Sequence, residues 1–289
     1  MKPINSAEYL KSQTNMNIRL MLKQWIDNHF FGKSGKLISG GDSDRVVVFA
    51  PHQDDETLGC GGTIIKKIQR GSQVWVVYMT DGSRTNNNHI HQYLPTDELI
   101  EMRRLEALQA CAALGVVEER VSFLGYEDST LCNNIASATQ KVRDIVSDIR
   151  PTSIFIPYRN DGHPDHEATA QIAMDVLMAL HQAADVYEYP AWFWNYWPMT
   201  KMDLKKLYRE KRLLTEILTM VRGLKALNCT HDIQGVLDQK RNAIMQHRSQ
   251  MQNIVGSDSW GTLPKVGDGE WFKYFFKRNE VFCYSRLGN

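Results

Sequence analysis

The sequence has no long apolar run and no marked excess of charge of either sign. None of its hydrophobic stretches approaches the roughly 20 residues that cross a bilayer. The start of the chain, MKPINSAEYLKSQTNMNIRL, lacks the continuous apolar stretch of a secretory signal. We therefore expect a cytoplasmic protein. The formal net charge is +1, so no global field attracts nucleic acid, and we expect no nucleic-acid partner.

Cysteines are few, odd in number and far apart. The five of them form no CxxC pair, which argues against a disulfide framework and against a cysteine zinc site. A metal bound by this chain would therefore need His, Asp or Glu ligands. Internal repeats and low-complexity tracts are also absent from the sequence.

The middle of the chain alternates short β-branched runs with segments of helical periodicity. We expect strands over 45–50, 74–80, 121–126, 153–158 and 186–192, and helices over 56–70, 96–114 (with Thr96 as N-cap), 134–149 and 164–182. This alternation predicts an α/β fold of Rossmann-like, doubly wound type. Its sheet would be mostly parallel, with helices on both faces.

The flanking regions predict additions to this core. Residues 6–31 have the pattern of an amphipathic helix, with apolar side chains at Leu10, Ile18, Leu22, Trp25 and Ile26. We expect an N-terminal helix and linker over 1–43, a catalytic core over 44–192, and a helical, aromatic C-terminal extension over 193–289. At 289 residues these parts fit one structural domain.

A second flanking helix is predicted over 201–225, with an apolar stripe that includes Leu204, Leu207 and Leu214. It carries eight Lys or Arg against three acidic residues. A solvated face or a subunit contact in a homo-oligomer would explain this charge. The alternative is a surface that meets anionic lipid.

Two clusters of His and carboxylate residues follow predicted strands. One is Pro51-His52-Gln53-Asp54-Asp55-Glu56, and the other is Asn160-Asp161-Gly162-His163-Pro164-Asp165-His166-Glu167. In open α/β sheets the ligand site lies beyond the carboxyl ends of the strands. A catalytic zinc takes three protein ligands and leaves one position open, and two His with one Asp would satisfy that count. The alternative for each cluster alone is a hydrogen-bonded helix cap.

These residues resemble the LmbE-like (PIG-L) family of zinc-dependent N-deacetylases. PHQDDETLGCGGTI is similar to the first family motif, AHPDDE, and HPDH at 163–166 is identical to the second. Thr80-Asp81-Gly82, the segment 103–106 and Tyr126-Glu127-Asp128 extend the match over residues 44–192, with a weaker echo in KRNAIMQHRSQ at 240–250.

The resemblance implies a role for each matched residue. His52, Asp55 and His166 would bind one Zn²⁺ per chain, and Asp54 would be the general base. A protonated His163, held by Asp165, would share the stabilisation of the oxyanion with the metal. Either Asp54 or His163 would protonate the leaving amine.

Some positions depart from the family pattern or have two interpretations. Asp161 stands where some members have a tyrosine that assists the transition state. Glu56 either balances the helix dipole or supports a zinc ligand. The glycines at 59, 61 and 62 lack the GxGxxG spacing of a dinucleotide site and suit close helix packing instead.

Substrate contacts are expected from three further residues. Arg103 and Asp128 match positions that contact the sugar in family members, although Arg103 also suits a surface helix and Asp128 a turn. Seven aromatic residues crowd Tyr187–Trp197, and Trp194 or Trp197 would either wall the sugar site or pack in the C-terminal region.

The resulting expectation is a hydrolase that removes the N-acetyl group from an N-acetylglucosamine-type amino sugar. The products would be a free amine and acetate. One alternative is a zinc amidase acting on another amide, such as a sugar–thiol conjugate. The other is a sugar-binding relative without turnover.

Overall fold

A seven-stranded sheet forms the centre of the molecule, with strand order β3-β2-β1-β4-β5-β7-β6. The computed structural model describes residues 6–33, 35, 40–84, 94–201, 213–257 and 260–288. The strands are β1 Arg45–Ala50, β2 Gln73–Thr80, β3 Val121–Tyr126, β4 Ser153–Pro157, β5 Ala184–Tyr189, β6 Cys229–Asp232 and β7 Asn279–Leu287. Strands β1 to β5 pair in parallel, whereas β7 runs antiparallel to β5 and β6. The predicted, mostly parallel α/β architecture is confirmed.

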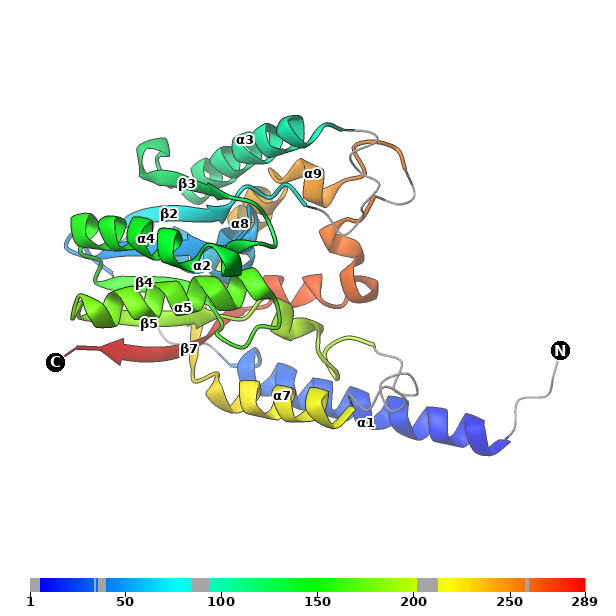
Figure 1. The fold of residues 1–289 in the computed structure, drawn as a ribbon. Helices are drawn as coiled ribbons and strands as arrows, with labels where there is room; N and C mark the ends of the chain where they lie inside the picture. The colour runs from blue at the N-terminus through cyan, green and yellow to red at the C-terminus, as the bar shows by residue number, and fades with distance from the viewer. Residues whose placement is uncertain are drawn as a thin grey trace.

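Helices cover both faces of the sheet, as predicted. Their bounds are α1 Ser6–Phe30, α2 Asp55–Gln69, α3 Thr96–Leu114, α4 Ile135–Ile149, α5 Pro164–Ala179, α7 Leu213–Ala226, α8 Leu237–Ile244 and α9 Arg248–Met251. Figure 1 shows α4 and α5 in front of the sheet, where they bury one set of strand side chains, including Val47 and Phe49. Helices α2, α3 and α8 bury the alternate set, including Val46 and Val48, on the other face. The two-residue period of β1 thus separates two apolar cores.

The C-terminal region contributes to the sheet itself. Strands β6 and β7 both lie beyond residue 192, and neither was predicted from the sequence. Helix α8 packs against α2 and α3, so this region also completes one of the two helical layers. At the start of α3, Pro95 is the N-cap and Thr96 is the first helical residue, which corrects the predicted cap.

Glycines near the start of α2 permit close packing, as the sequence suggested. A Cβ atom added at Gly59 would lie 2.2 Å from the ring of Tyr189, and one at Gly62 would lie 2.7 Å from Ile233. Neither separation is compatible with van der Waals contact. Gly59 therefore lets α2 approach β5 directly beside the residues that follow β1.

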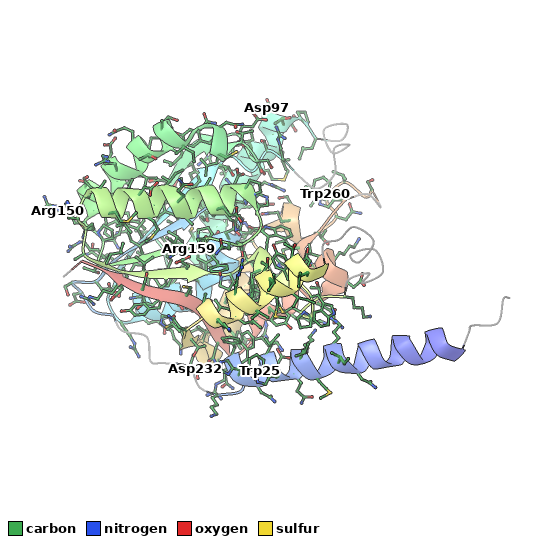
Figure 2. The ribbon with its side chains drawn as sticks, turned by 60° about the horizontal axis from the view of Figure 1, so that its bottom comes forward. Trp25, Asp97, Arg150, Arg159, Asp232 and Trp260 are labelled. Carbon is green, nitrogen blue, oxygen red and sulfur yellow. The ribbon has the colours of Figure 1, made fainter. Side chains whose placement is uncertain are left out.

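Helices α1 and α7 lie side by side in Figure 1 and line a shared apolar pocket, and Trp25 of α1 is labelled in Figure 2. Ile26 is buried, but Trp25 is 54% exposed and Leu214 is 67% exposed. The predicted amphipathic stripe of α1 is therefore only partly buried, since Ile18 and Leu22 are exposed too. Leu204 and Leu207 of the second predicted helix, and the side chain of Leu10, lie outside the described residues. Among the described helices, none combines the length and apolarity needed to cross a bilayer.

Candidate active site

A cavity of ≈ 330 Å³ opens at the carboxyl ends of the parallel strands. The segments that follow β1, β2, β3 and β4 all reach it, together with residues of the C-terminal region. Its lining includes His52, Asp54, Asp55, Arg84, Arg103, Asp128, His163, Trp192, Gln250, Lys265 and Trp271. Both His and carboxylate clusters predicted from the sequence meet here, because parallel strands end at one edge of the sheet.

The three predicted metal ligands are adjacent. Asp55 Oδ2 lies 3.3 Å from His52 Nδ1 and 3.3 Å from His166 Nε2. Two ligand atoms about 2.0–2.1 Å from a tetrahedral zinc ion would be roughly 3.3 Å apart. The two observed separations have this length, so Asp55 stands between the two histidines at distances compatible with a shared ion.

Each of the two histidines also faces a carboxylate through its other ring nitrogen. Asp161 Oδ2 lies 2.9 Å from His166 Nδ1, and Asp165 Oδ2 lies 3.3 Å from His52 Nε2. Asp128 Oδ1 is also 3.3 Å from His52 Nε2. Histidines that bind metals usually have such a carboxylate or carbonyl on the second nitrogen, which fixes the orientation of the ring.

Asp165 therefore contacts a different histidine from the one predicted. It was expected to hold His163, but its carboxylate accepts hydrogen bonds from the backbone amides of Ser129 and Leu131, at 2.6 and 3.1 Å. These bonds turn the side chain towards the segment after β3 and towards His52. Only the backbone amide of Asp165 contacts His163, by donating to its Nδ1 at 3.3 Å.

The interior of the site fits a cation. His166 is fully buried, and neither of its ring nitrogens has a described partner with hydrogen-bond geometry, despite the nearby carboxylates. Burial lowers the pKa of His52, but its carboxylate neighbours outweigh this effect and hold the pKa well above its ordinary value. Ring nitrogens of His52, His163 and His166 also lie within 4.8 Å of one another. A buried histidine and carboxylate set of this kind can hold a divalent metal ion.

Asp54 is buried and directly precedes the predicted ligand Asp55. Among the described residues it forms no ion pair with His52 or His166. Burial and the charge of Asp55 raise its pKa to about 8. Gln250 donates a hydrogen bond from Nε2 to Asp54 Oδ2 at 2.6 Å. The backbone of Asp54 has φ 150°, which L-residues rarely adopt. The residue is thus held in a strained conformation that directs its carboxylate into the cavity.

Glu56 stabilises this backbone conformation of Asp54. Its Oε2 accepts a hydrogen bond from the backbone amide of Asp54 at 3.1 Å, and its Oε1 lies 3.1 Å from His247 Nε2. Glu56 and His247 are both fully buried. The sequence had offered the helix dipole or support of a zinc ligand, whereas these contacts join Glu56 to Asp54 and His247. His247 and Gln250 were not predicted as site residues, although the motif echo at 240–250 contained both.

The hydrogen bond to His163 indicates its tautomer. In the absence of a metal ion, burial and the charges of His52 and His166 lower its pKa to about 4. Because Nδ1 accepts from the amide of Asp165, the ring proton belongs on Nε2, where it can donate a hydrogen bond.

Two of the three predicted substrate contacts line the cavity. Arg103 is 7% exposed and donates from Nη1 to the carbonyl oxygens of Gly82, at 2.5 Å, and Arg84, at 3.2 Å. Asp128 accepts from the amide of Arg84 at 3.3 Å and approaches His52. Neither is a plain surface or turn residue, because both face the cavity from buried positions.

Trp194, the third, does not line the cavity. It is 3% exposed and stacks on Tyr274 at a centroid distance of 5.0 Å in an apolar core. Trp192 lines the cavity instead and stacks on Trp271 at 5.2 Å. The chain leaves the strand after Tyr189 and turns through a 3₁₀ segment, Trp192–Asn195. Because of this turn, Trp192 faces the cavity and Trp194 packs in the core.

Asp161 anchors that turn and does not occupy the cavity. Its carboxylate accepts hydrogen bonds from the backbone amides of Ala191, Trp192 and Phe193, each at 2.9 Å. It is fully buried and faces His166. It therefore orients a predicted ligand, and the structure gives it no contact with the cavity that would replace a tyrosine.

The part of the chain that forms this cavity is similar in sequence to known proteins. Residues 47–177 match the model of the PIG-L family, described as GlcNAc-PI de-N-acetylase. The probable N-acetyl-alpha-D-glucosaminyl L-malate deacetylase 2 of Bacillus cereus is 24% identical over 217 residues, 73% of this chain and 86% of that protein.

Two solved structures show how far the fold extends. N,N'-diacetylchitobiose deacetylase from Pyrococcus horikoshii matches with a TM-score of 0.55 and 21% identity, over 99% of this chain and 95% of that one. The 4-carboxy-2-hydroxymuconate hydratase GalB from Pseudomonas putida matches with a TM-score of 0.51 and 13% identity, over 85% and 97%. Because a hydratase shares the fold, the fold alone does not define the reaction. The motif residues, their meeting in one cavity and the match over residues 47–177 make this part of the chain similar to the PIG-L deacetylases.

Proposed function

We propose that this protein hydrolyses the N-acetyl amide of an N-acetylglucosamine-type amino sugar, giving a free amine and acetate. One observation carries the proposal: a buried carboxylate, Asp54, with a pKa near 8, adjoins the set His52, Asp55 and His166 in one cavity. The similarity of residues 47–177 to the PIG-L family and the deacetylase names of the relatives support this substrate class.

The ligand set proposed for Zn²⁺ is His52 Nδ1, Asp55 and His166 Nε2. When bound there, the ion would supply Lewis acidity at the scissile carbonyl and a water of lowered pKa. Asp165 and Asp161 then hold the outer nitrogens of the two imidazoles. Burial raises the pKa of Asp55, but the neighbouring histidines lower it by a larger amount. Asp55 therefore stays ionised.

Asp54 takes a proton from the attacking water and returns it to the leaving amine. A base whose pKa lies near the working pH can do both. His163 accepts the amide of Asp165 at Nδ1, so its Nε2–H can donate a hydrogen bond to the developing oxyanion. Trp192 and Trp271 offer aromatic faces to the sugar ring.

Acetate release from a panel of N-acetylglucosaminides tests this function. The wild-type protein should lose activity with a chelator and regain it with Zn²⁺. Asp54→Asn should keep the metal and lose at least ~100-fold in kcat, the usual scale for a general base. Asp238→Asn, on the exposed face of α8, is the matched control. Near-normal turnover by the Asp54 variant would overturn the assignment of the base.

The same panel separates the alternatives. Chelator-sensitive cleavage of a sugar–thiol amide, without acetate release, would indicate an amidase. Sugar binding without any cleavage would indicate a non-catalytic relative.

Partners other than the substrate are proposed only for the surface of α1 and α7. Its exposed apolar side chains, including Trp25 and Leu214, favour a contact surface over a solvated face. Sedimentation with liposomes that contain or lack anionic lipid tests the lipid contact, and sedimentation velocity without lipid tests self-association.

A further inference from the structure

The charged residues that line the cavity divide into two sets. Asp54, Asp55 and Asp128 are acidic, and Arg84, Arg103 and Lys265 are basic. Each acidic side chain already has a partner in the chemistry proposed above. Asp55 and Asp128 contact His52, and Asp54 accepts from Gln250. The deacetylation proposed above gives no role to the three basic side chains.

Lys265 is the least committed of the basic residues. It lies in the 3₁₀ segment Leu263–Gly269, and its side chain is exposed at the cavity. Within the described part of the chain, no carboxylate forms an ion pair with it. Its ammonium group is therefore available to a ligand.

Arg103 is buried but only partly used. Its Nη1 donates to two backbone carbonyls, while its Nε is buried and has no partner among the described residues. No described carboxylate forms a direct ion pair with its guanidinium, although Asp128 and Asp54 lie near enough to favour its charge. Its unused N–H groups can still donate to an anionic ligand in the cavity.

Arg84 adds a third cation to the same wall. Its Nη2 pairs with Glu127 at 2.7 Å, but both side chains are more than half exposed. An exposed pair of this kind contributes little, so a ligand can compete for the guanidinium. The backbone carbonyl of Arg84 also accepts from Arg103, which ties the two arginines together.

We propose that the amino sugar bound here carries an anionic group on its aglycone, a carboxylate or a phosphate, which Lys265, Arg84 and Arg103 bind. This inference rests on the proposed deacetylation, because it assigns the acidic half of the cavity to the acetamide. Guanidinium groups bind both kinds of anion through paired N–H donors, and the lysine adds a mobile charge. A neutral aglycone would leave Lys265 without an ion-pair partner among the described residues and would not use the free donors of the two arginines.

Matched substrates test the proposal directly. We would measure kcat/KM of the wild-type protein with three N-acetylglucosaminides whose aglycones bear a carboxylate, a phosphate or a neutral hydroxyl group. At least one anionic substrate should be preferred by about tenfold, the value of one charge-assisted hydrogen bond. Rising ionic strength should reduce that preference.

Variants then assign the preference to residues. Lys265→Met should remove most of the preference and leave turnover of the neutral substrate unchanged. Arg84→Gln should act in the same direction. Lys273→Met, at an exposed lysine in the neighbouring segment Phe272–Phe276, is the matched control and should change neither.

The outcomes distinguish this inference from the proposed function. Preference for the carboxylate or for the phosphate supports it and identifies the anion. Equal turnover of all three substrates overturns it and leaves the deacetylase function intact. A preference that survives both Lys265→Met and Arg84→Gln overturns the assigned residues. Acetate release from none of the substrates overturns the proposed function itself.

Discussion

Replacing Gln250 with alanine tests whether the C-terminal region positions the general base. The side-chain amide of Gln250 donates to Asp54 Oδ2 at 2.6 Å and is buried with it. The fold around Gln250 is held independently, since Glu106 accepts from both the amide and the hydroxyl of Ser249, at 2.8 and 2.7 Å. The variant should therefore fold and retain the metal.

The magnitude follows from the charge on the acceptor. A hydrogen bond to a charged group contributes about 1.5–3 kcal/mol. If the bond orients Asp54 in the transition state, its loss lowers kcat by roughly 10- to 100-fold, at about 1.4 kcal/mol for each factor of ten. KM should change much less, because the bond contacts the base and not the sugar.

Steady-state acetate release at saturating substrate is the assay, with the zinc content and the unfolding curve measured on the same samples. Gln246→Ala is the control: among the described residues, that side chain donates to Asn242 in its own segment. The reasoning is refuted if Gln250→Ala keeps kcat close to that of the control while its metal content and stability match the wild type.

Three further outcomes are expected elsewhere in the molecule. Trp192→Ala should raise KM for the sugar, whereas Trp194→Ala should lower the free energy of unfolding by about 3–5 kcal/mol, because it leaves a core cavity; kinetics and urea denaturation separate the two. Lys240→Met should cost about 3–5 kcal/mol in urea denaturation, because it leaves the buried Glu280, 2.7 Å from Lys240 Nζ, without its cation; a loss below about 1 kcal/mol would contradict this. Burial raises the pKa of Asp44, but its hydrogen bonds outweigh this and lower it, so its stabilisation is present above the unfolded-state pKa and is lost as pH falls through the folded-state value. Asp44→Asn should therefore destabilise the protein at pH 7, and the difference from wild type should shrink in acid; a pH-independent difference in thermal unfolding would exclude this explanation.

The parts of the fold that local pattern defines could be predicted from the sequence. Strands β1 to β5 have compact apolar runs, and the helices between them have clear periodicity. Strand β6 has only four residues, CTHD, and exists because β7 pairs with it. Nothing in so short a polar segment marks it as a strand, so its identity depends on a partner about fifty residues away.

The same limit applies to the site. The meeting of the two clusters is predictable, because both follow strands that end at one edge of the sheet. The choice of His52, Asp55 and His166 as ligands depended on the resemblance to the family motifs. The orientation of Asp165 is not, because it depends on the backbone amides of a loop from another part of the chain. Trp192 and Trp194 have similar local sequence, and only the 3₁₀ turn after β5 decides which of them meets the cavity.

The position of β7 between β5 and β6 has a consequence for how this protein is made. During synthesis, β1 to β5 and their histidines emerge from the ribosome before His247, Gln250 and β7. A nascent chain halted after β5 could gather metal ligands but would lack the partners of Glu56 and Asp54 and would expose the edge of β5. Chaperone binding and metal uptake should therefore precede catalytic competence, and ribosome-bound chains arrested before residue 247 should bind zinc yet release no acetate.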